Sequence, residues 1–436
     1  MDEIFHFFLF NREEGNKSSS FASWTGMECG RVISVLGRRV VSRGPNCRIG
    51  ELLLARTPDG NLVRCLVEGF EGFHIQTIAL DNPDGLACGN GIYGTGRPIS
   101  LSAGPHLKGE LMDGMGCPAD GSNPAQGKSF YPTMHPNGQR LALFSFKRKF
   151  QTGLRCIDTL MPLAAGQRVS FQSSTTSPGL TSKTLSMMAR YSSASVVVFG
   201  LVGTSRRRLA ELVASLEPQA RAKSAIFAAP SDRGAGERYH CVYAATAAAE
   251  YFRDQGEEVL LIIDCLRAWQ ESYLELSLQI PQPARVSLEG VPLSRLVERA
   301  GPRPQGSITA IYTVRGPATT LTRNLEDLVD GRICLTGEME SMGVYPPIDI
   351  LNSHSRPSQQ FLSPRQLRMI SSFQWVMRYY QRNRQLIQVG ALFKGLSERS
   401  DQALDKVERC WSFLRQGINE PSSEEEDMQR LAQCVR

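Results

Sequence analysis

The sequence lacks any long apolar run, strong charge imbalance or paired cysteine motif. No stretch approaches about 18 consecutive apolar residues, so the sequence gives no indication of a transmembrane helix. The amino-terminal MDEIFHFFLFN has a short apolar run, but Asp2 and Glu3 precede it where a signal peptide carries positive charge. No small-residue cleavage site follows it. We therefore predict that residues 1–26 form a flexible tail, with a peripheral docking segment as the alternative for the apolar run.

A cysteine pattern for metal binding or redox chemistry is also missing. The 11 cysteines are scattered from Cys29 to Cys434, and no two have the CxxC spacing of a zinc or thioredoxin-type site. Scattered buried thiols in a reducing cytosol are the simplest interpretation. The net charge of +6 over 436 residues is mild, and we predict no nucleic-acid partner.

The composition is that of a soluble globular protein long enough for two or three domains, with 41% hydrophobic and 21% charged residues. From residue 27 to 100, short runs such as GELLLAR and NLVRCLVEGF are separated by Gly, Pro, Asn and Asp at hairpin spacing. This pattern predicts an N-terminal β-barrel. Residues 101–150 are rich in Gly, Pro and Asp, and we predict a connecting segment there.

Over residues 151–356, apolar runs of strand length alternate with longer helical patterns. The strand candidates are RVSFQ (168–172), VVVFGLV (196–202), VLLIID (259–264) and ITAIYTV (308–314). Alternation of this kind predicts an α/β domain built on a parallel sheet. Residues 357–436 are charged and helical in pattern, and predict a C-terminal α-helical domain.

The phosphate-binding motif expected after the first strand of such a sheet is incomplete. The motif reads G-x-x-x-x-G-K-[ST], in which glycines let backbone N–H groups surround the phosphates and the lysine contacts them. The segment after RVSFQ reads SSTTSPGLTSKTLSMMAR, with Gly179 as its single glycine and Ser182 before Lys183. Pro178 also removes a backbone donor. The segment is rich in hydroxyl groups and correctly placed, but the motif is absent in its strict form.

A second lysine-containing segment does not replace it. Gly127-Lys128-Ser129 follows Gly121 with five intervening residues, where the motif has four, and no predicted strand precedes it. We do not assign it to phosphate binding.

Other residues could carry nucleotide chemistry. Asp264 ends the run VLLIID, at the carboxyl end of a buried strand, where α/β sheets bind ligands and an aspartate can hold magnesium. Asp264 could equally cap a helix or end a strand. Tyr345 precedes two prolines, and Arg356 ends the segment SHSR. An aromatic near adenine and an arginine reaching a neighbour's phosphate would fit a ring ATPase, although an arginine such as Arg356 also fits a surface ion pair.

Together these segments resemble the ATPase subunits of bacterial type III secretion and flagellar protein export, which are relatives of the rotary ATP synthase subunits. The resemblance runs from about Gly30 to the C-terminus. Its most specific stretches are TGLRCIDTLMPLAAGQR, AATAAAEYFRDQGEEVLLIID, GSITAIYTV, VYPPIDILNSHSR and LIQVGALFKGLSERSDQALD.

The resemblance implies a β-barrel, a P-loop (RecA-like) α/β domain and a helical domain, with six copies forming a ring. It implies ATP and Mg²⁺ as cofactors, and a cytoplasmic position peripheral to the inner membrane. The implied partners are stalk and stator proteins, the export gate and effector–chaperone complexes. The implied work is chaperone release and export of effector proteins.

Carried over residue by residue, the family's site is only partly matched. Asp264 falls on the magnesium-site aspartate, Arg356 on the arginine finger that acts in trans, and Tyr345 on the adenine-stacking tyrosine. The family's P-loop lysine falls on Thr181 and its magnesium-binding hydroxyl on Ser182, with Lys183 two places later. The candidate phosphate and cofactor residues are accordingly Gly179, Thr181, Ser182, Lys183, Thr184 and Tyr345, and the candidate metal ligands are Asp264 and Ser182.

The glutamate that orients the attacking water in the family falls on Thr204. Loss of such a group commonly costs about 10²–10⁴-fold in rate, so we expect impaired catalysis. Two hypotheses remain open. The chain is either a secretion ATPase with an unusual working site, or a non-catalytic ring subunit of the same apparatus. The ring is either a homo-hexamer or a mixed hexamer with an intact ATPase paralogue. Neither the cargo nor the choice between injectisome and flagellum follows from the sequence.

Overall fold

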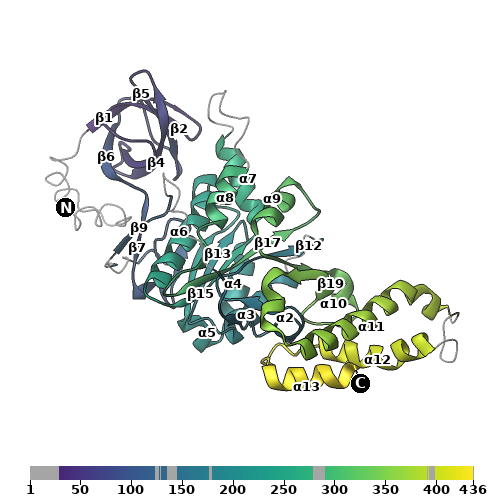
Figure 1. Cartoon of the computed structure of the whole chain (residues 1–436). Helices are drawn as coiled ribbons and strands as arrows, with labels where there is room; N and C mark the ends of the chain where they lie inside the picture. Colours follow the sequence, from purple (N-terminus) through teal and green to yellow (C-terminus); the bar gives the residue numbers. More distant parts are fainter. Residues whose placement is uncertain are drawn as a thin grey trace.

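Three successive parts of the chain lie along an elongated molecule in the computed structural model: a barrel, a central sheet covered by helices, and a helical end (Figure 1). The structure describes residues 29–122, 127, 129–134, 145–175, 179–277, 290–389, 391 and 398–435. The predicted flexible tail and Lys128 lie outside these residues. No helix among them is both long and apolar enough to cross a membrane.

The first part is a closed antiparallel barrel in the order β1-β2-β5-β4-β3-β6. Closure leaves no strand edge open to pairing with another chain. Side chains on alternate positions fill its interior, among them Val32, Val40, Leu53 and Ile92. The strands are β1 (Cys29–Leu36), β2 (Arg39–Arg43), β3 (Glu51–Arg56), β4 (Leu62–Glu71), β5 (His74–Ala79) and β6 (Gly91–Pro98).

The segment after the barrel contributes strands to two different sheets. β7 (Ser100–Ala103) pairs with β9 (Ser129–Pro132), whereas β8 (Leu111–Asp113) adds to the edge of the central sheet beside β14 (Ser224–Ala229). This segment also holds the 3-10 turn η2 (Pro105–Leu107). The connection therefore has a structural role in the central domain as well as linking it to the barrel.

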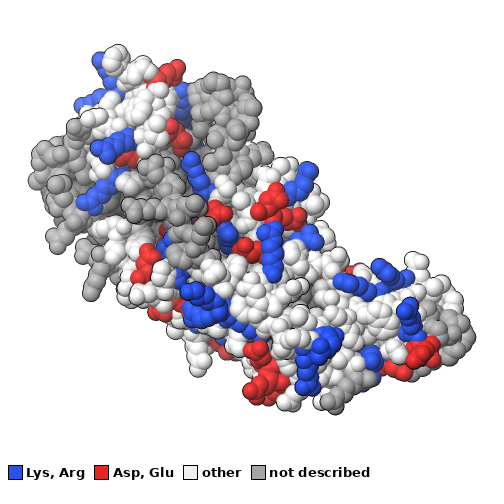
Figure 2. Space-filling model, in the orientation of Figure 1, with Lys and Arg blue, Asp and Glu red and all other residues white. Residues whose placement is uncertain are grey.

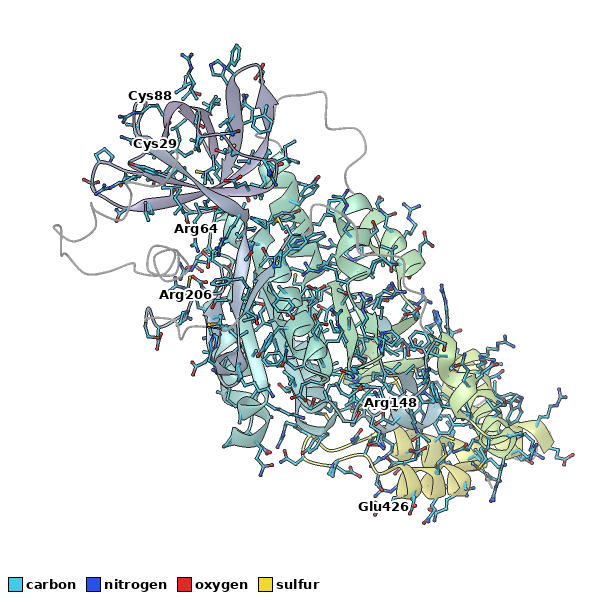
Figure 3. The ribbon with its side chains drawn as sticks, turned by 60° about the vertical axis from the view of Figure 1, so that its left-hand side comes forward. Cys29, Arg64, Cys88, Arg148, Arg206 and Glu426 are labelled. Atoms are coloured by element: carbon cyan, nitrogen blue, oxygen red, sulfur yellow. The ribbon has the colours of Figure 1, made fainter. Side chains whose placement is uncertain are left out.

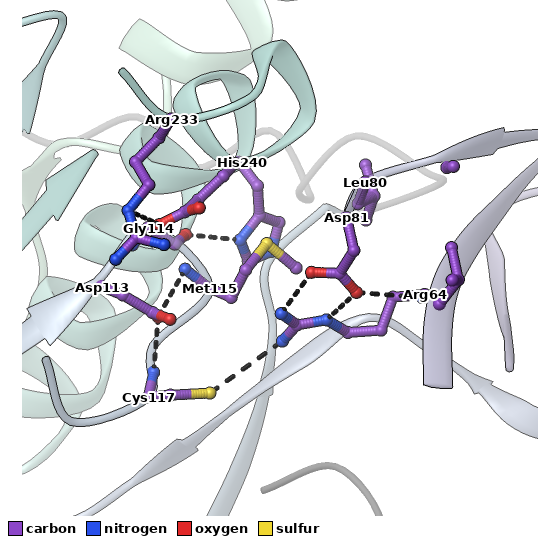
Figure 4. Close-up of polar contacts among 12 residues, drawn as sticks. Arg64, Leu80, Asp81, Asp113, Gly114, Met115, Cys117, Arg233 and His240 are labelled. Atoms are coloured by element: carbon purple, nitrogen blue, oxygen red, sulfur yellow. Dashed lines mark hydrogen bonds and ion pairs between the residues drawn. The ribbon is translucent and has the colours of Figure 1, made fainter. Parts of the chain in front are cut away.

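Polar contacts join the barrel to this segment (Figure 4). The Arg64 guanidinium donates to both carboxylate oxygens of Asp81, at 2.8 and 2.7 Å, and lies 3.9 Å from the Cys117 sulfur. Asp113 Oδ1 accepts from the backbone N–H groups of Met115 and Cys117 at 2.9 Å each. A carboxylate that accepts two backbone bonds holds the loop that carries Cys117 in one conformation.

The central sheet has the order β19-β18-β12-β17-β15-β13-β14-β8. Its strands are parallel except β19, which is antiparallel to β18, and β16, a short antiparallel addition to β17. The four predicted strands are confirmed, since these apolar runs are buried on both faces. The remaining strand bounds are β12 (Arg168–Ser173), β13 (Val196–Val202), β15 (Glu258–Asp264), β16 (Gly301–Pro302), β17 (Ser307–Arg315), β18 (Gly331–Leu335) and β19 (Ile348–Ser355).

Helices cover both faces of the sheet, and each face has its own apolar core. Helices α6 (Ala235–Asp254), α7 (Leu266–Ser277), α8 (Gly290–Val297) and α9 (Thr320–Leu328) lie on one face. The opposite core contains α2 (Arg155–Leu160), α3 (Gly179–Tyr191), α4 (Arg206–Ser215) and α5 (Pro218–Ala222). The short pair β10 (Lys149–Phe150) and β11 (Leu163–Ala164) flanks α2, and α10 (Gly337–Ser341) precedes β19.

The C-terminal part consists of three helices whose core is continuous with that of the α2–α5 face. The 3-10 turn η4 (Arg356–Phe361) leads into α11 (Pro364–Gln388), α12 (Glu398–Leu414) and α13 (Glu424–Val435). Ser363 and Gln366 form a capping box at the start of α11. With the barrel and the parallel sheet, these helices confirm the predicted fold class.

Charges of both signs lie on the surface (Figure 2), and the expected burial of the thiols holds for five of the eleven cysteines. Basic and acidic side chains are both scattered over the face shown in Figure 2, and neither sign covers it continuously. In the described part of the chain the eleven cysteines form no disulfide. Cys29 and Cys88 lie exposed on the barrel, at the opposite end of the molecule from Glu426 of α13 (Figure 3).

Candidate functional site

The candidate site lies at the carboxyl edge of the central sheet, where β12, β17, β15 and β13 end side by side. Strand β17 lies between β12, which leads into the loop before α3, and β15, which ends in Asp264. In this register Ser173 is opposite Arg315, and Leu201 is opposite Asp264. A side chain at the end of β17 is therefore placed between the candidate phosphate loop and the candidate metal ligand.

Asp264 is held by protein groups on both carboxylate oxygens. The Thr313 hydroxyl donates to its Oδ1 at 2.6 Å, and Arg315 Nη2 donates to its Oδ2 at 3.3 Å. The Arg315 and Asp264 side chains are 10% and 8% exposed. Burial lowers the pKa of Arg315, but the effects of Asp264 and Cys265 together outweigh it, and the pKa is raised overall. The pair is thus a charged, mostly buried ion pair.

The residue after Asp264 has an unusual backbone conformation that supports this arrangement. Cys265 has a φ of 65°, the single positive value among the described non-glycine residues. Its N–H donates at 2.8 Å to Thr313 Oγ1, the same atom that donates to Asp264. The turn between β15 and α7 is therefore tied to β17, and Asp264 is fixed in orientation.

A second arginine contacts the turn that follows Arg315. Arg267, in the first turn of α7, donates from Nη2 to the Pro317 carbonyl at 2.8 Å, and its guanidinium lies against Gly316. The Gly316 N–H in turn donates to the Ser173 carbonyl at 2.8 Å, which joins this turn to the end of β12. Two guanidinium groups and one carboxylate thus occupy this part of the edge.

The candidate phosphate loop begins with hydroxyl groups. The Thr175 N–H donates to Ser173 Oγ at 3.3 Å, and the two side-chain oxygens lie 3.2 Å apart. Residues 176–178 lie outside the described residues, and α3 begins at Gly179. The N–H groups of the first turn of a helix have no partner within the helix and favour anions. Phosphate binding at this helix start is compatible with the fold.

The candidate side chains on α3 point in different directions. Thr181 and Thr184 are buried, Ser182 is half-buried and Lys183 is exposed. Lys183 is the fifth residue of α3, which places it beyond the first turn of about 3.6 residues. In a P-loop the lysine and the magnesium-binding hydroxyl lie at the loop end of the helix.

Tyr345 lies next to α3. It comes from the loop between α10 and β19 and packs against the core that contains Leu185 and Met188. Burial raises the pKa of Tyr345 to about 12, with a smaller opposing effect from Thr184. Its hydroxyl is buried without a hydrogen-bond partner of ordinary geometry among the described residues. The structure therefore brings together two of the predicted nucleotide-binding residues, Tyr345 and Thr184.

Thr204 follows β13 and brings no carboxylate to the edge. It comes after Gly203, which has a φ of 66°, and its carbonyl accepts from the Ser231 N–H at 3.1 Å. The next residues begin α4 with exposed arginines, of which Arg206 pairs with Asp232 at 2.6 Å. A threonine hydroxyl is a poor base, so this loop cannot accept a proton from water as a glutamate would.

Arg356 lies at the opposite edge of the sheet. It follows Ser355, which pairs with Gly331 at the amino end of β18. Its side chain is exposed and lines a pocket of about 260 Å³. The pocket residues are Glu326, Asp327, Val329, Gly331, Arg332, His354 and Arg356. Burial and the charges of Arg332 and Arg356 lower the pKa of His354. Arg356 is separated from Asp264 of its own chain by the length of the strands and faces solvent.

The residues at the carboxyl edge do not fit a magnesium ion. Magnesium needs oxygen ligands and a negative site, and here the one candidate carboxylate is already paired with a guanidinium. No group of three or more His, Cys, Asp or Glu side chains among the described residues is placed to hold a metal. Sequence reasoning missed Arg315 and Arg267. The signal available for Arg315 was a charged residue directly after the apolar run ITAIYTV, the same signal that identified Asp264.

Comparisons with known proteins agree with this architecture. Residues 153–355 match the ATP synthase alpha/beta family, nucleotide-binding domain, and residues 362–433 match the T3SS EscN ATPase C-terminal domain. A flagellum-specific ATP synthase of Salmonella typhimurium is 33% identical over 430 residues, 92% of each chain. A type 3 secretion system ATPase of Xanthomonas euvesicatoria is 32% identical over 425 residues, covering 93% of this chain and 94% of the relative.

Solved structures show the same fold over most of the chain. The assembled ATPase EscN of the enteropathogenic E. coli type III secretion system superposes with a TM-score of 0.84 and 28% identity. The match covers 93% of this chain and 100% of EscN. EscN in complex with its central stalk EscO gives the same values. The chain belongs to the family of type III secretion system and flagellum-specific export ATPases.

Proposed function

We propose that this chain is a subunit of the hexameric cytoplasmic ATPase ring of a type III protein secretion apparatus, with impaired catalysis at its own site. The ring couples nucleotide binding to chaperone release and export of effector proteins, beside the inner membrane. The structure of EscN with its stalk EscO supports a ring with a central stalk. Stator proteins, the export gate and effector–chaperone complexes are the further partners we propose.

The proposal of impaired catalysis rests on one observation: the carboxyl edge of the sheet offers no free carboxylate among the site residues. Asp264 is paired with Arg315, and Thr204 stands where a carboxylate would orient water. Without a base, a bound water molecule is not activated, and such a loss commonly costs about 10²–10⁴-fold in rate. The exposed Lys183 supplies no replacement for a base.

A non-catalytic ring subunit is the second candidate, and the position of Arg356 favours it. Arg356 is exposed at the edge of the sheet away from its own Asp264, so its guanidinium is available to a nucleotide bound by a neighbouring copy. An arginine supplied in trans stabilises the charge that develops on a transferring phosphoryl group. In a mixed ring, this chain would assist an intact paralogue without turning over ATP itself.

Hydrolysis of MgATP by the purified, assembled chain tests the proposal. We expect a rate at least about 10²-fold below that of an intact export ATPase in the same assay. Asp264→Ala and Lys183→Ala are measured beside the wild type, because a reshaped but working site would lose its turnover in both variants. A rate equal to that of the intact relative, abolished by both substitutions, would contradict impaired catalysis.

A further inference from the structure

We infer that Arg315 takes the place of the divalent cation, so that this chain binds nucleotide phosphates through guanidinium groups and without Mg²⁺. This inference rests on the proposed function in one respect, namely that the carboxyl edge is a nucleotide site. It concerns the chemistry of that site and is independent of whether hydrolysis follows.

Arg315 lies where a metal ion would neutralise the charge of Asp264. Because β17 lies between β12 and β15, its last residue lies between the loop that precedes α3 and Asp264. Arg315 Nη2 is 3.3 Å from Asp264 Oδ2, and the Thr313 hydroxyl is 2.6 Å from Oδ1. The positive charge that a metal would bring to this aspartate is already supplied by the chain, and both carboxylate oxygens have partners.

The positive charge at this edge disfavours a divalent cation and favours phosphate. A divalent cation entering beside Asp264 would meet the buried guanidinium of Arg315, and that of Arg267 lies close by against Gly316. Like charges in a poorly hydrated site repel strongly, and Mg²⁺ gives up its water ligands reluctantly. The same two guanidinium groups suit phosphate oxygens, which planar N–H donors bind in pairs.

The candidate phosphate loop after β12 offers hydroxyl groups but little positive charge of its own. It presents hydroxyl groups at Ser173 and Thr175, and the lysine of α3 is exposed beyond the first turn. Phosphate binding needs positive charge as well as hydrogen-bond donors. Among the described residues of this edge, Arg315 directly precedes the turn joined to Ser173, and Arg267 contacts that turn from α7.

Calorimetric titration of the assembled wild-type chain with ATP tests the inference, once in excess EDTA and once in excess magnesium chloride. We expect ATP to bind at least as tightly in EDTA as in magnesium chloride. In the magnesium buffer the Mg²⁺ bound to ATP is repelled by the guanidinium of Arg315. Arg315→Lys should keep this behaviour, since it keeps the charge.

Arg315→Leu should weaken binding in EDTA by about tenfold or more, and magnesium should then restore part of it. Arg168→Leu is the matched control. Arg168 also forms a 3.3 Å ion pair, with Asp330, but it lies at the amino end of β12, away from the site. This variant should bind ATP as the wild type does in both buffers.

Two outcomes would overturn the inference and are distinguishable. Wild-type binding that magnesium tightens about tenfold or more would show a working metal site, and the nucleotide-binding ring subunit proposed above would stand. Absence of ATP binding in both buffers would overturn the inference and leave the non-catalytic ring subunit as the function. Neither outcome depends on the folding of a variant, since both are read on the wild-type chain.

Discussion

His240 is a titratable side chain buried in the joint between the barrel-side connection and α6. It is 1% exposed, with Nδ1 2.9 Å from the Gly114 carbonyl and Nε2 2.8 Å from Thr133 Oγ1. Burial is the main cause that lowers the pKa of His240, to about 4, and the charge of Arg64 lowers the pKa further. The hydrogen bond to Gly114 and the charge of Asp81 act in the opposite direction (Figure 4). The imidazole is therefore neutral in the folded chain over the physiological range.

A pH-dependent loss of stability follows from this burial. The unfolded chain takes up the His240 proton near pH 6.5, whereas the folded chain does so only near pH 4. Stability is therefore fully present above pH 6.5 and falls as the pH is lowered toward 4. We expect the wild type to lose about 2–3 kcal/mol relative to His240→Gln between pH 7.5 and 4.5, measured by urea unfolding.

The comparison with His240→Gln is necessary because another buried group has the opposite sign. Burial raises the pKa of Asp158 to about 6, so the stability linked to Asp158 falls as the pH rises from about 4 to 6. Asp158 is present in both chains and cancels in the difference. A difference between the two chains that stays constant with pH would show that His240 titrates alike in the folded and unfolded states.

At the scale of elements, a buried arginine of the central domain is tied to the C-terminal helices. Arg155, at the start of α2, donates from Nε to Asp427 of α13 at 2.8 Å and from Nη1 to the Phe413 and Arg415 carbonyls. The Arg155 and Asp427 side chains are each 3% exposed. Asp427 also accepts from Ser422 at 2.7 Å, before α13 begins. The contact thus ties α2 to both α12 and α13.

Arg155→Met should loosen the C-terminal helices. It leaves the Asp427 carboxylate buried without its partner, which typically costs about 3–5 kcal/mol. We expect faster proteolytic release of residues beyond α11 and a lower unfolding midpoint. Arg155→Met combined with Asp427→Leu should recover most of the loss. Arg207→Met is the control, since its pair with Glu211 is 89% and 61% exposed and such pairs contribute little. Equal effects of Arg155→Met and Arg207→Met would contradict the anchor.

Elements with strong local patterns were predictable from the sequence, and contacts between distant segments were not. The strands β12, β13, β15 and β17 are continuous apolar runs because both of their faces are covered. β8 was missed because it is three residues long within a segment rich in Gly and Pro, and its partner β14 lies far along the chain.

The same limit applies to the site. The position of Asp264 and the incomplete motif around Gly179 are local features and could be read from the sequence. The Asp264–Arg315 pair joins residues 51 apart, and no local pattern indicates it until β15 and β17 are adjacent. The resemblance to export ATPases carried over roles for Asp264, Thr204 and Arg356, but it could not indicate a residue such as Arg315 that lies outside the motifs.

At the scale of the whole molecule, the two edges of the central sheet have different roles in a ring. The carboxyl edge holds the chain's own candidate site, and the pocket with Arg356 lies at the amino edge, facing outward. A subunit with a poor site of its own can still complete the site of a neighbour. The contribution of this chain to ATP hydrolysis in a mixed ring would then depend on Arg356.

Titration of this chain into an intact export ATPase should show that dependence. We expect the wild-type chain to sustain hydrolysis by the intact subunits and Arg356→Ala to depress it, by up to about 10³-fold for each site that receives the altered finger. Arg323→Ala, an exposed arginine on α9 outside the pocket lining, serves as the control. Superimposable titrations with the wild-type and Arg356→Ala chains would exclude a contribution in trans.

The placement of β8 affects the order in which the chain can complete its central sheet during translation. β8 is synthesised before every other strand of that sheet, yet its partner β14 follows only after β12 and β13. The barrel can close early, because its strands are consecutive in the chain. β8 cannot pair until β14 has been synthesised. A fragment that starts at Thr152 would leave β14 as a bare edge with unpaired backbone groups. A central domain cut at Thr152 therefore lacks its edge strand, and the cut has to precede β8 if the sheet is to be complete.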